Sequence, residues 1–206
     1  MRRAKRNAFL SPAQTLRVET HLSARAAEGG LQLSDALAVI FVEGETERIV
    51  LRTQTAVEQE GVCVLDFGQI GLESLLRSAD AHDCPWHVLV DGDEAGAHYA
   101  NTARQSLRRR SPASHITVSD HSTFEHALWE SGYREALLAV AREHGVELQN
   151  DSLDAMLRAA RLKLPKPLLV ETAIRRARAC DANLELPSKM RAAILAVRKL
   201  ATQSSG

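Results

Sequence analysis

The stretch Leu37-Ala-Val-Ile-Phe-Val42-Glu43-Gly44-Glu-Thr-Glu47 decides the fold of this chain. Its first six residues form an uninterrupted apolar run, which is typical of a strand buried on both faces of a parallel sheet. Carboxylates follow directly where this strand ends. Trp86-His-Val-Leu-Val90-Asp91-Gly92-Asp93-Glu94-Ala-Gly96 has the same order of short apolar strand and acidic turn. Because ligand sites lie beyond the carboxyl ends of parallel strands, we expect both acidic groups at one edge of the sheet.

Short apolar runs alternate with longer amphipathic ones around these two segments. The predicted strands are 37–42, 62–65, 86–90 and 115–118, and the helices between them are 46–60, 70–81 and 95–109. This alternation implies right-handed crossovers, so the predicted fold is α/β, with a Rossmann-like, mostly parallel four-stranded sheet flanked by helices.

Helices are also predicted before and after this core. One lies at 11–27, and the others lie at 124–131, 134–143, 152–162, 168–180 and 189–200. The expected organisation is an N-terminal helical lead-in (1–35), the α/β core (36–130) and a C-terminal helical subdomain (131–203).

Composition narrows the class of protein. The 206 residues hold 26 Lys+Arg and 26 Asp+Glu, but residues 1–103 carry a net charge of −6 and residues 104–206 one of +6. No apolar run is long enough to cross a bilayer, so we expect no membrane association. The three cysteines are widely spaced, which excludes a disulfide scaffold and favours a cytoplasmic protein.

The acidic residues predict a site for hard cations. Asp91 and Asp93 are one residue apart, with Gly92 allowing a tight turn, and Glu43 and Glu47 are four apart. Four converging carboxylates would repel one another unless they were protonated or neutralised, and oxygen ligands select Mg²⁺, Mn²⁺ or Ca²⁺ over Zn²⁺. The alternative is that acidic side chains merely favour helix N-termini, which explains Glu47 more readily than the strand-end carboxylates.

These motifs resemble the Toprim domain, in particular that of the OLD (overcoming lysogenization defect) nucleases. The resemblance rests on the Glu-Gly motif with a second Glu four positions on, and on Asp-x-Asp-x-x-Gly after the third strand. Ser122-Thr123-Phe124-Glu125 and the Pro187-containing last helix are further matches. The similarity runs from about residue 12 to residue 200 and corresponds to the C-terminal region of those proteins.

The resemblance implies a Mg²⁺- or Mn²⁺-dependent DNA endonuclease or nickase that uses two cations, with Ca²⁺ expected to bind without supporting turnover. The implied metal ligands are Glu43, Glu47, Asp91, Asp93 and Glu125. Glu43 would double as general base, Asp91 would be essential to catalysis, and Lys166 or, as the second choice, Lys189 would stabilise the transition state.

Basic residues of the second half are candidates for contacts with the DNA backbone. The main candidates are Arg158, Arg161, Arg175 and Arg176, and a further run lies at Arg108-Arg109-Arg110. Such contacts hold phosphates without reading the base sequence.

Several alternatives to a nuclease stay open. A primase-like or RNA-maturing Toprim enzyme shares the Asp-x-Asp motif, and a non-catalytic Toprim module would bind DNA or a protein partner. OLD proteins also carry an ABC-type ATPase, but no Gly-Lys phosphate-loop motif occurs here. The expected partners are therefore DNA, an ATPase domain outside this chain, and a second copy of the chain in a homodimer.

Overall fold

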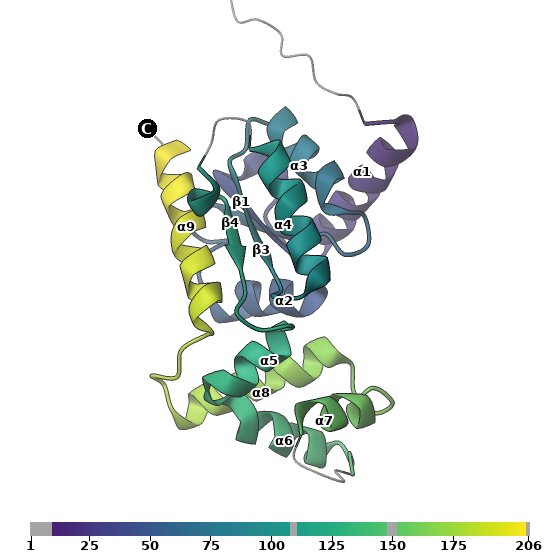
Figure 1. The fold of residues 1–206 in the computed structure, drawn as a ribbon, viewed down its shortest axis with the longest axis vertical. Coiled ribbons are helices and arrows are strands. Elements are labelled where there is room, and N and C mark those ends of the chain that lie inside the picture. The colour runs from purple at the N-terminus through teal and green to yellow at the C-terminus, as the bar shows by residue number, and fades with distance from the viewer. Residues whose placement is uncertain (1–9, 108–110, 148–151, 205–206) are drawn as a thin grey trace, which may run out of the picture.

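A four-stranded parallel sheet forms the centre of the computed structural model, which describes residues 10–107, 111–147 and 152–204 (Figure 1). The strands are β1 (Ala38–Val42), β2 (Val62–Asp66), β3 (Trp86–Val90) and β4 (Ile116–Val118). Their order is β2-β1-β3-β4, so β1 and β3 lie side by side, with Val39 opposite Trp86 and Val42 opposite Leu89. This arrangement confirms the predicted α/β class and places the two acidic strand ends next to each other.

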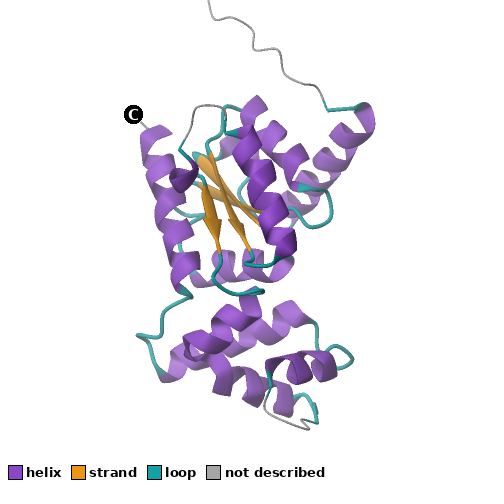
Figure 2. Cartoon of the chain, viewed as in Figure 1, coloured by secondary structure: helices purple, strands orange, loops and turns teal. Residues whose placement is uncertain are grey.

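Helices surround the sheet and also lie beyond its carboxyl end (Figure 2). The helices that connect or precede the strands are α1 (Pro12–Ala27), α2 (Glu45–Gln54), α3 (Leu72–Ala81) and α4 (Glu94–Ser106). The later helices are α5 (Phe124–Leu128), α6 (Arg134–Glu143), α7 (Leu153–Ala160), α8 (Lys166–Cys180) and α9 (Ser188–Ser204), with a π-helical turn (Trp129–Tyr133) between α5 and α6.

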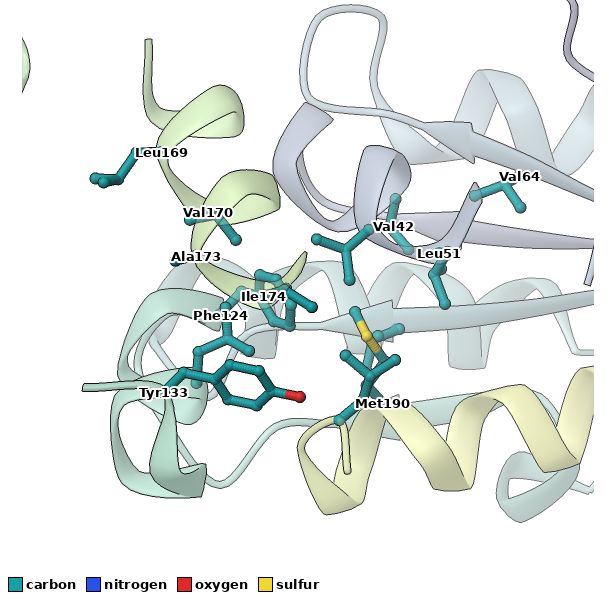
Figure 3. Packing of buried hydrophobic residues seen from close by; sticks show 14 of the residues in the cluster. Val42, Leu51, Val64, Phe124, Tyr133, Leu169, Val170, Ala173, Ile174 and Met190 are labelled. Carbon is teal, nitrogen blue, oxygen red and sulfur yellow. The ribbon is translucent and has the colours of Figure 1, made fainter. Parts of the chain in front are cut away.

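Each face of the sheet has its own apolar core. Val39, Phe41 and Trp86 pack with α1, α3 and α4 on one face, whereas Ile40 and Val42 belong to the cluster of the other face. That second cluster continues from the sheet into α5–α9, and Figure 3 shows Phe124, Ile174 and Met190 meeting Val42 there. The second core therefore fixes the position of α5–α8 relative to the strand ends.

The predicted helix 46–60 is too long, because α2 ends at Gln54. Thr55 is extended, and its hydroxyl donates a hydrogen bond to the carbonyl oxygen of Leu51. The Thr55 hydroxyl oxygen in turn accepts the Val57 N–H at 3.4 Å. Threonine side chains that bond to local backbone in this way compete with helical hydrogen bonds. Val57 is therefore part of a turn, not of a helix, and its side chain is buried.

The last helix differs from the expected C-terminal subdomain. Helix α9 lies along the sheet and contacts all four strands, whereas α6 and α8 pack on each other beyond the strand ends (Figure 1). The predicted segment 131–203 thus contributes to both parts of the molecule. No helix in the described ranges combines the length and the apolar character that crossing a bilayer requires.

Candidate metal centre

Glu43 and Glu47 enter the site from the end of β1 and the start of α2. Gly44 caps α2 in an extended conformation, and a Cβ at this position would lie 2.9 Å from Glu47 Oε2. The glycine therefore leaves room for the Glu47 carboxylate to fold back over the strand end. Glu47 is only 8% exposed, whereas Glu43 is half-buried.

Asp91 and Asp93 follow β3 in a turn that depends on glycine. The Asp91 N–H donates to Glu43 Oε2 at 3.4 Å, and Asp93 Oδ1 caps α4 by accepting the Gly96 N–H at 2.7 Å. A Cβ on Gly96 would stand 2.0 Å from the Asp91 carbonyl oxygen, far inside van der Waals contact. Only glycine at position 96 lets α4 begin so close to Asp91. Asp93 is exposed, and one of its oxygens is committed to the cap.

Glu125 reaches the same region from α5. Thr123 caps this helix by accepting the His126 N–H at 3.3 Å, so Glu125 lies in the first turn and is buried. Its Oε1 has no hydrogen-bond partner, but the Lys166 ammonium at the start of α8 lies 3.1 Å away as an ion pair. A buried carboxylate oxygen in this state is a strong potential ligand for a cation.

The electrostatics of the site show that these carboxylates face a shared region. Burial raises the pKa of Asp91 to about 8, and the charges of Glu47, Glu43, Glu125 and Asp93 add to this increase. Burial and the charge of Glu125 raise the pKa of Glu47 to about 7. Burial also raises the pKa of Glu43, although the Asp91 N–H and the Lys166 charge act against it. A positive charge placed near Asp91, Glu47 and Glu43 would stabilise the ionised forms of all three carboxyl groups.

The fit to a metal ion is chemical more than geometric. The oxygen-only donor set, which includes the buried Glu125 carboxylate beside Lys166, suits Mg²⁺ or Mn²⁺. However, no three Asp, Glu, His or Cys side chains of the described residues stand in an arrangement that could hold an ion as they are. Binding by the five predicted ligands therefore requires side-chain rotation, and their role as ligands stays a prediction.

Both candidate lysines lie beside this cluster. Lys166 pairs with Glu125, and its positive charge partly offsets the increase in the pKa of Glu43 and Glu47. Lys189 pairs with Asp120 at 3.3 Å and lines a small cleft together with Glu47 and Asp91. The structure thus brings both lysines to the site without distinguishing their roles, although Lys166 has the direct contact with a predicted ligand.

The arginines predicted to contact DNA fall into two groups. Arg158 and Arg161 line a cleft that also contains Glu125 and Lys166. Arg175 instead pairs with Glu171 at 2.8 Å, and Arg176 pairs with Glu143. The further predicted run, Arg108-Arg109-Arg110, lies outside the described residues.

Sequence reasoning missed Asp66, the last residue of β2. It is buried, and its Oδ1 lies 3.0 Å from both Arg25 Nε and Arg48 Nε, while Glu28 contacts both guanidinium groups. The strand-end position that identified Asp91 would have identified Asp66 as well. Its two arginine partners occupy its oxygens, however, so Asp66 joins α1 and α2 to the sheet and is not part of the carboxylate cluster.

Comparison with known proteins gives the class of this domain. Residues 36–93 match the family described as "Overcoming lysogenization defect protein-like, TOPRIM domain". The uncharacterized protein YbjD of Escherichia coli (strain K12) is 36% identical over 110 residues, which are 50% of this chain. The match covers 20% of YbjD, so the chain corresponds to a small part of that protein.

Two solved structures have the same fold. They are the C-terminal regions of the OLD proteins of Xanthomonas campestris pv. campestris and Burkholderia pseudomallei, with TM-scores of 0.55 and 0.51. Sequence identity is 18% and 19%, and the alignments cover 82% and 81% of this chain and 98% of each of those chains. Residues 36–93 thus match an OLD-like Toprim domain, as the motifs predicted, and the chain shares the fold of the C-terminal regions of the two OLD proteins.

Proposed function

We propose that this chain is a Mg²⁺- or Mn²⁺-dependent phosphodiesterase that cleaves DNA, with its active site at the carboxyl ends of β1 and β3. The observation that carries the proposal is the cluster of carboxylates around Asp91, whose pKa is raised to about 8 by burial and by four neighbouring acidic side chains. Strongly perturbed groups that share a cleft are typical of functional sites. The match of residues 36–93 to an OLD-like Toprim domain favours nuclease chemistry for this cluster.

Glu43, Glu47, Asp91, Asp93 and Glu125 are the residues that would hold the cations. The chemistry that Mg²⁺ or Mn²⁺ supplies when bound is activation of water and stabilisation of charge on the phosphate. Asp91 is central because it interacts electrostatically both with Glu43, which follows β1, and with Glu125 of α5.

Glu43 is the proposed general base. Its carboxylate is half-buried, and the Asp91 N–H fixes its orientation through Oε2. Glu43 takes the proton of the attacking water as the water oxygen bonds to phosphorus. The bond from phosphorus to one ester oxygen breaks, and that leaving oxygen takes a proton from solvent. The raised pKa of Glu43 increases its affinity for that proton.

Lys166 is the proposed electrostatic stabiliser of the phosphate. Its Nζ lies 3.1 Å from Glu125 Oε1, yet the side chain is 54% exposed, so a backbone phosphate can approach the same ammonium. Lys189 is the second candidate for this role. Removing one such donor from a transition state typically costs about 10²–10³ in rate.

A nicking assay on supercoiled plasmid tests the proposed function. The wild type should nick DNA with Mg²⁺ or Mn²⁺, and Asp91→Ala should abolish nicking, while Asp35→Ala, an exposed aspartate before β1, should retain it. Lys166→Ala should lower the rate about 100-fold or more if this lysine stabilises the transition state, and Lys189→Ala is compared with it. Cleavage that persists in EDTA would refute the metal mechanism. DNA binding without any cleavage would favour the non-catalytic module instead.

A further inference from the structure

A cleft of about 360 Å³ lies next to the carboxylate cluster, between α5, α7, α8 and the turn that joins α7 to α8. Its size is at the lower end of small-molecule sites, which measure roughly 300–1,000 Å³. The floor is apolar and consists of Leu157, Leu164 and Leu169, of which the last two are buried in the main core. This floor is therefore a preformed surface and not an exposed, adaptable loop.

Cationic side chains surround this floor. Arg158 and Arg161 are exposed, lie three residues apart on one helical face, and make no ion pair with any other residue that the structure describes. Lys166 forms the side of the cleft nearest the site. Arg175 and Arg176, farther along α8, are both neutralised by glutamates. The rim of the cleft thus carries positive charge that no carboxylate of the described residues neutralises.

Glu125 connects the cleft to the proposed active site. It belongs to the cleft wall and also raises the pKa of Glu47 and Asp91. The wall further contains Thr123 and His126, which are hydrogen-bonded to each other at 2.9 Å, and Asp154, which lies 3.7 Å from His126 Nε2. A ligand in the cleft would therefore meet an apolar floor, polar groups on one wall and guanidinium groups at the rim.

We infer that this cleft binds a single unstacked nucleotide of the DNA strand, adjacent to the phosphate that is cleaved. This inference rests on the proposed function, because DNA is the polyanion that the site would act on. The base would lie on the leucine floor, and its phosphate would contact Arg158 and Arg161. Unstacked bases commonly pack against apolar side chains and guanidinium planes, which suits a cleft whose lining contains no Phe, Tyr or Trp.

Chemical-shift titration of the metal-free protein with 5′-dTMP, deoxyribose 5-phosphate and inorganic phosphate tests the inference directly. The nucleotide should bind about fivefold more tightly than deoxyribose 5-phosphate, because burial of the base against leucine side chains contributes roughly 1 kcal/mol. Shifts should centre on α5, α7 and the start of α8. Equal affinity for 5′-dTMP and deoxyribose 5-phosphate would overturn the inference and leave only a phosphate site.

Two variants with the same change of charge sharpen the test. Leu157→Glu places a negative charge in the cleft and should weaken 5′-dTMP binding about tenfold or more, whereas Leu162→Glu, a 92% exposed position outside the cleft, should change it less than twofold. Arg158→Glu alters an exposed side chain and provides a second cleft variant that leaves the core intact. Equal effects of the cleft and control variants would contradict the inference.

Nucleotide binding and DNA cleavage can fail independently in these experiments. If nicking is absent but 5′-dTMP binds as expected, the nucleotide site stands and the catalytic proposal falls. If nicking is metal-dependent but the nucleotide shows no preference over deoxyribose 5-phosphate, the catalytic proposal stands and the nucleotide site is refuted.

Discussion

Ionisation of Asp91 opposes folding in the metal-free protein. Its carboxyl is half-buried near four other acidic side chains, and its pKa of about 8 means that the folded state favours the protonated form. An aspartate in the unfolded chain ionises near pH 4. A bound cation would compensate for this unfavourable charge in the folded state.

Replacing Asp91 by asparagine should therefore increase stability while removing function. Asp91→Asn keeps the shape of the side chain and removes the buried charge, so we expect it to stabilise the metal-free protein at pH 8 by about 1 kcal/mol or more. Thermal or urea unfolding in EDTA measures this change, and Asp35→Asn provides an exposed control. A destabilised Asp91→Asn protein would contradict the electrostatic description of the site.

The residue types at the strand ends made Glu43 and Asp91 predictable, but they did not reveal which side chains contact each carboxylate. Asp66 stands at an equivalent position and differs because Arg25, which lies 41 residues earlier in α1, reaches it at 3.0 Å. Glycine at 96 was predictable from the motif, but its necessity appears only from the 2.0 Å approach to the Asp91 carbonyl. Pairing of this kind depends on tertiary contacts that local spacing does not encode.

Helix α1 is attached to the core by charge as well as by apolar packing. Arg25 and Glu28, at its end, join Arg48 of α2 and Asp66 of β2 in one network, in which Arg48 and Asp66 are almost fully buried. The amphipathic pattern of each helix predicts which face is buried, but it does not identify the partner. That is why α9 could be predicted as a helix although its position across the sheet could not.

Breaking this network should be costly. Asp66→Ala leaves the Arg25 and Arg48 guanidinium groups without their buried carboxylate, so we expect a loss of about 3–5 kcal/mol in the free energy of unfolding. Glu171→Ala removes the half-buried partner of the exposed Arg175 and should cost less than about 0.5 kcal/mol. Urea unfolding of the two variants checks the contrast, and similar losses would disprove a structural role for the buried network.

The whole molecule separates an acidic sheet edge from basic helices, but much of the basic charge is already paired. Arg198 forms two contacts with Glu60, at 2.5 and 2.7 Å, and thereby links α9 to the acidic half. Arg175, Arg176 and Arg191 are paired with glutamates as well. The excess of +6 in the second half therefore overstates the charge available to a polyanion.

Salt dependence of DNA binding should reveal this difference. The double variant Arg158→Ala, Arg161→Ala should reduce the slope of log K against log salt by about 2, because both side chains are available to phosphates. Arg175→Ala with Arg176→Ala should reduce it by less than about 1, since glutamates already neutralise them. Fluorescence anisotropy with a labelled duplex measures both slopes. Equal slopes would mean that the rim of the cleft is not the main phosphate contact.

The stability of the whole molecule should depend on pH and on divalent cations together. The pKa values of Asp91 and Glu47 are raised in the folded state, to about 8 and about 7, so their contribution to stability is complete below pH 4 and is lost as the pH rises to 8. His87 acts in the opposite direction: burial lowers its pKa to about 4, and its contribution is lost as the pH falls below 6.5.

Comparing the melting temperature in Mg²⁺ and in EDTA at each pH cancels the histidine contribution, because His87 is buried in β3 under both conditions. Cations compete with protons for carboxylates, so the increase caused by Mg²⁺ should be larger at pH 8 than at pH 6. The increase should disappear in Asp91→Asn, and an equal increase at both pH values would place Mg²⁺ binding elsewhere than at the ends of β1 and β3.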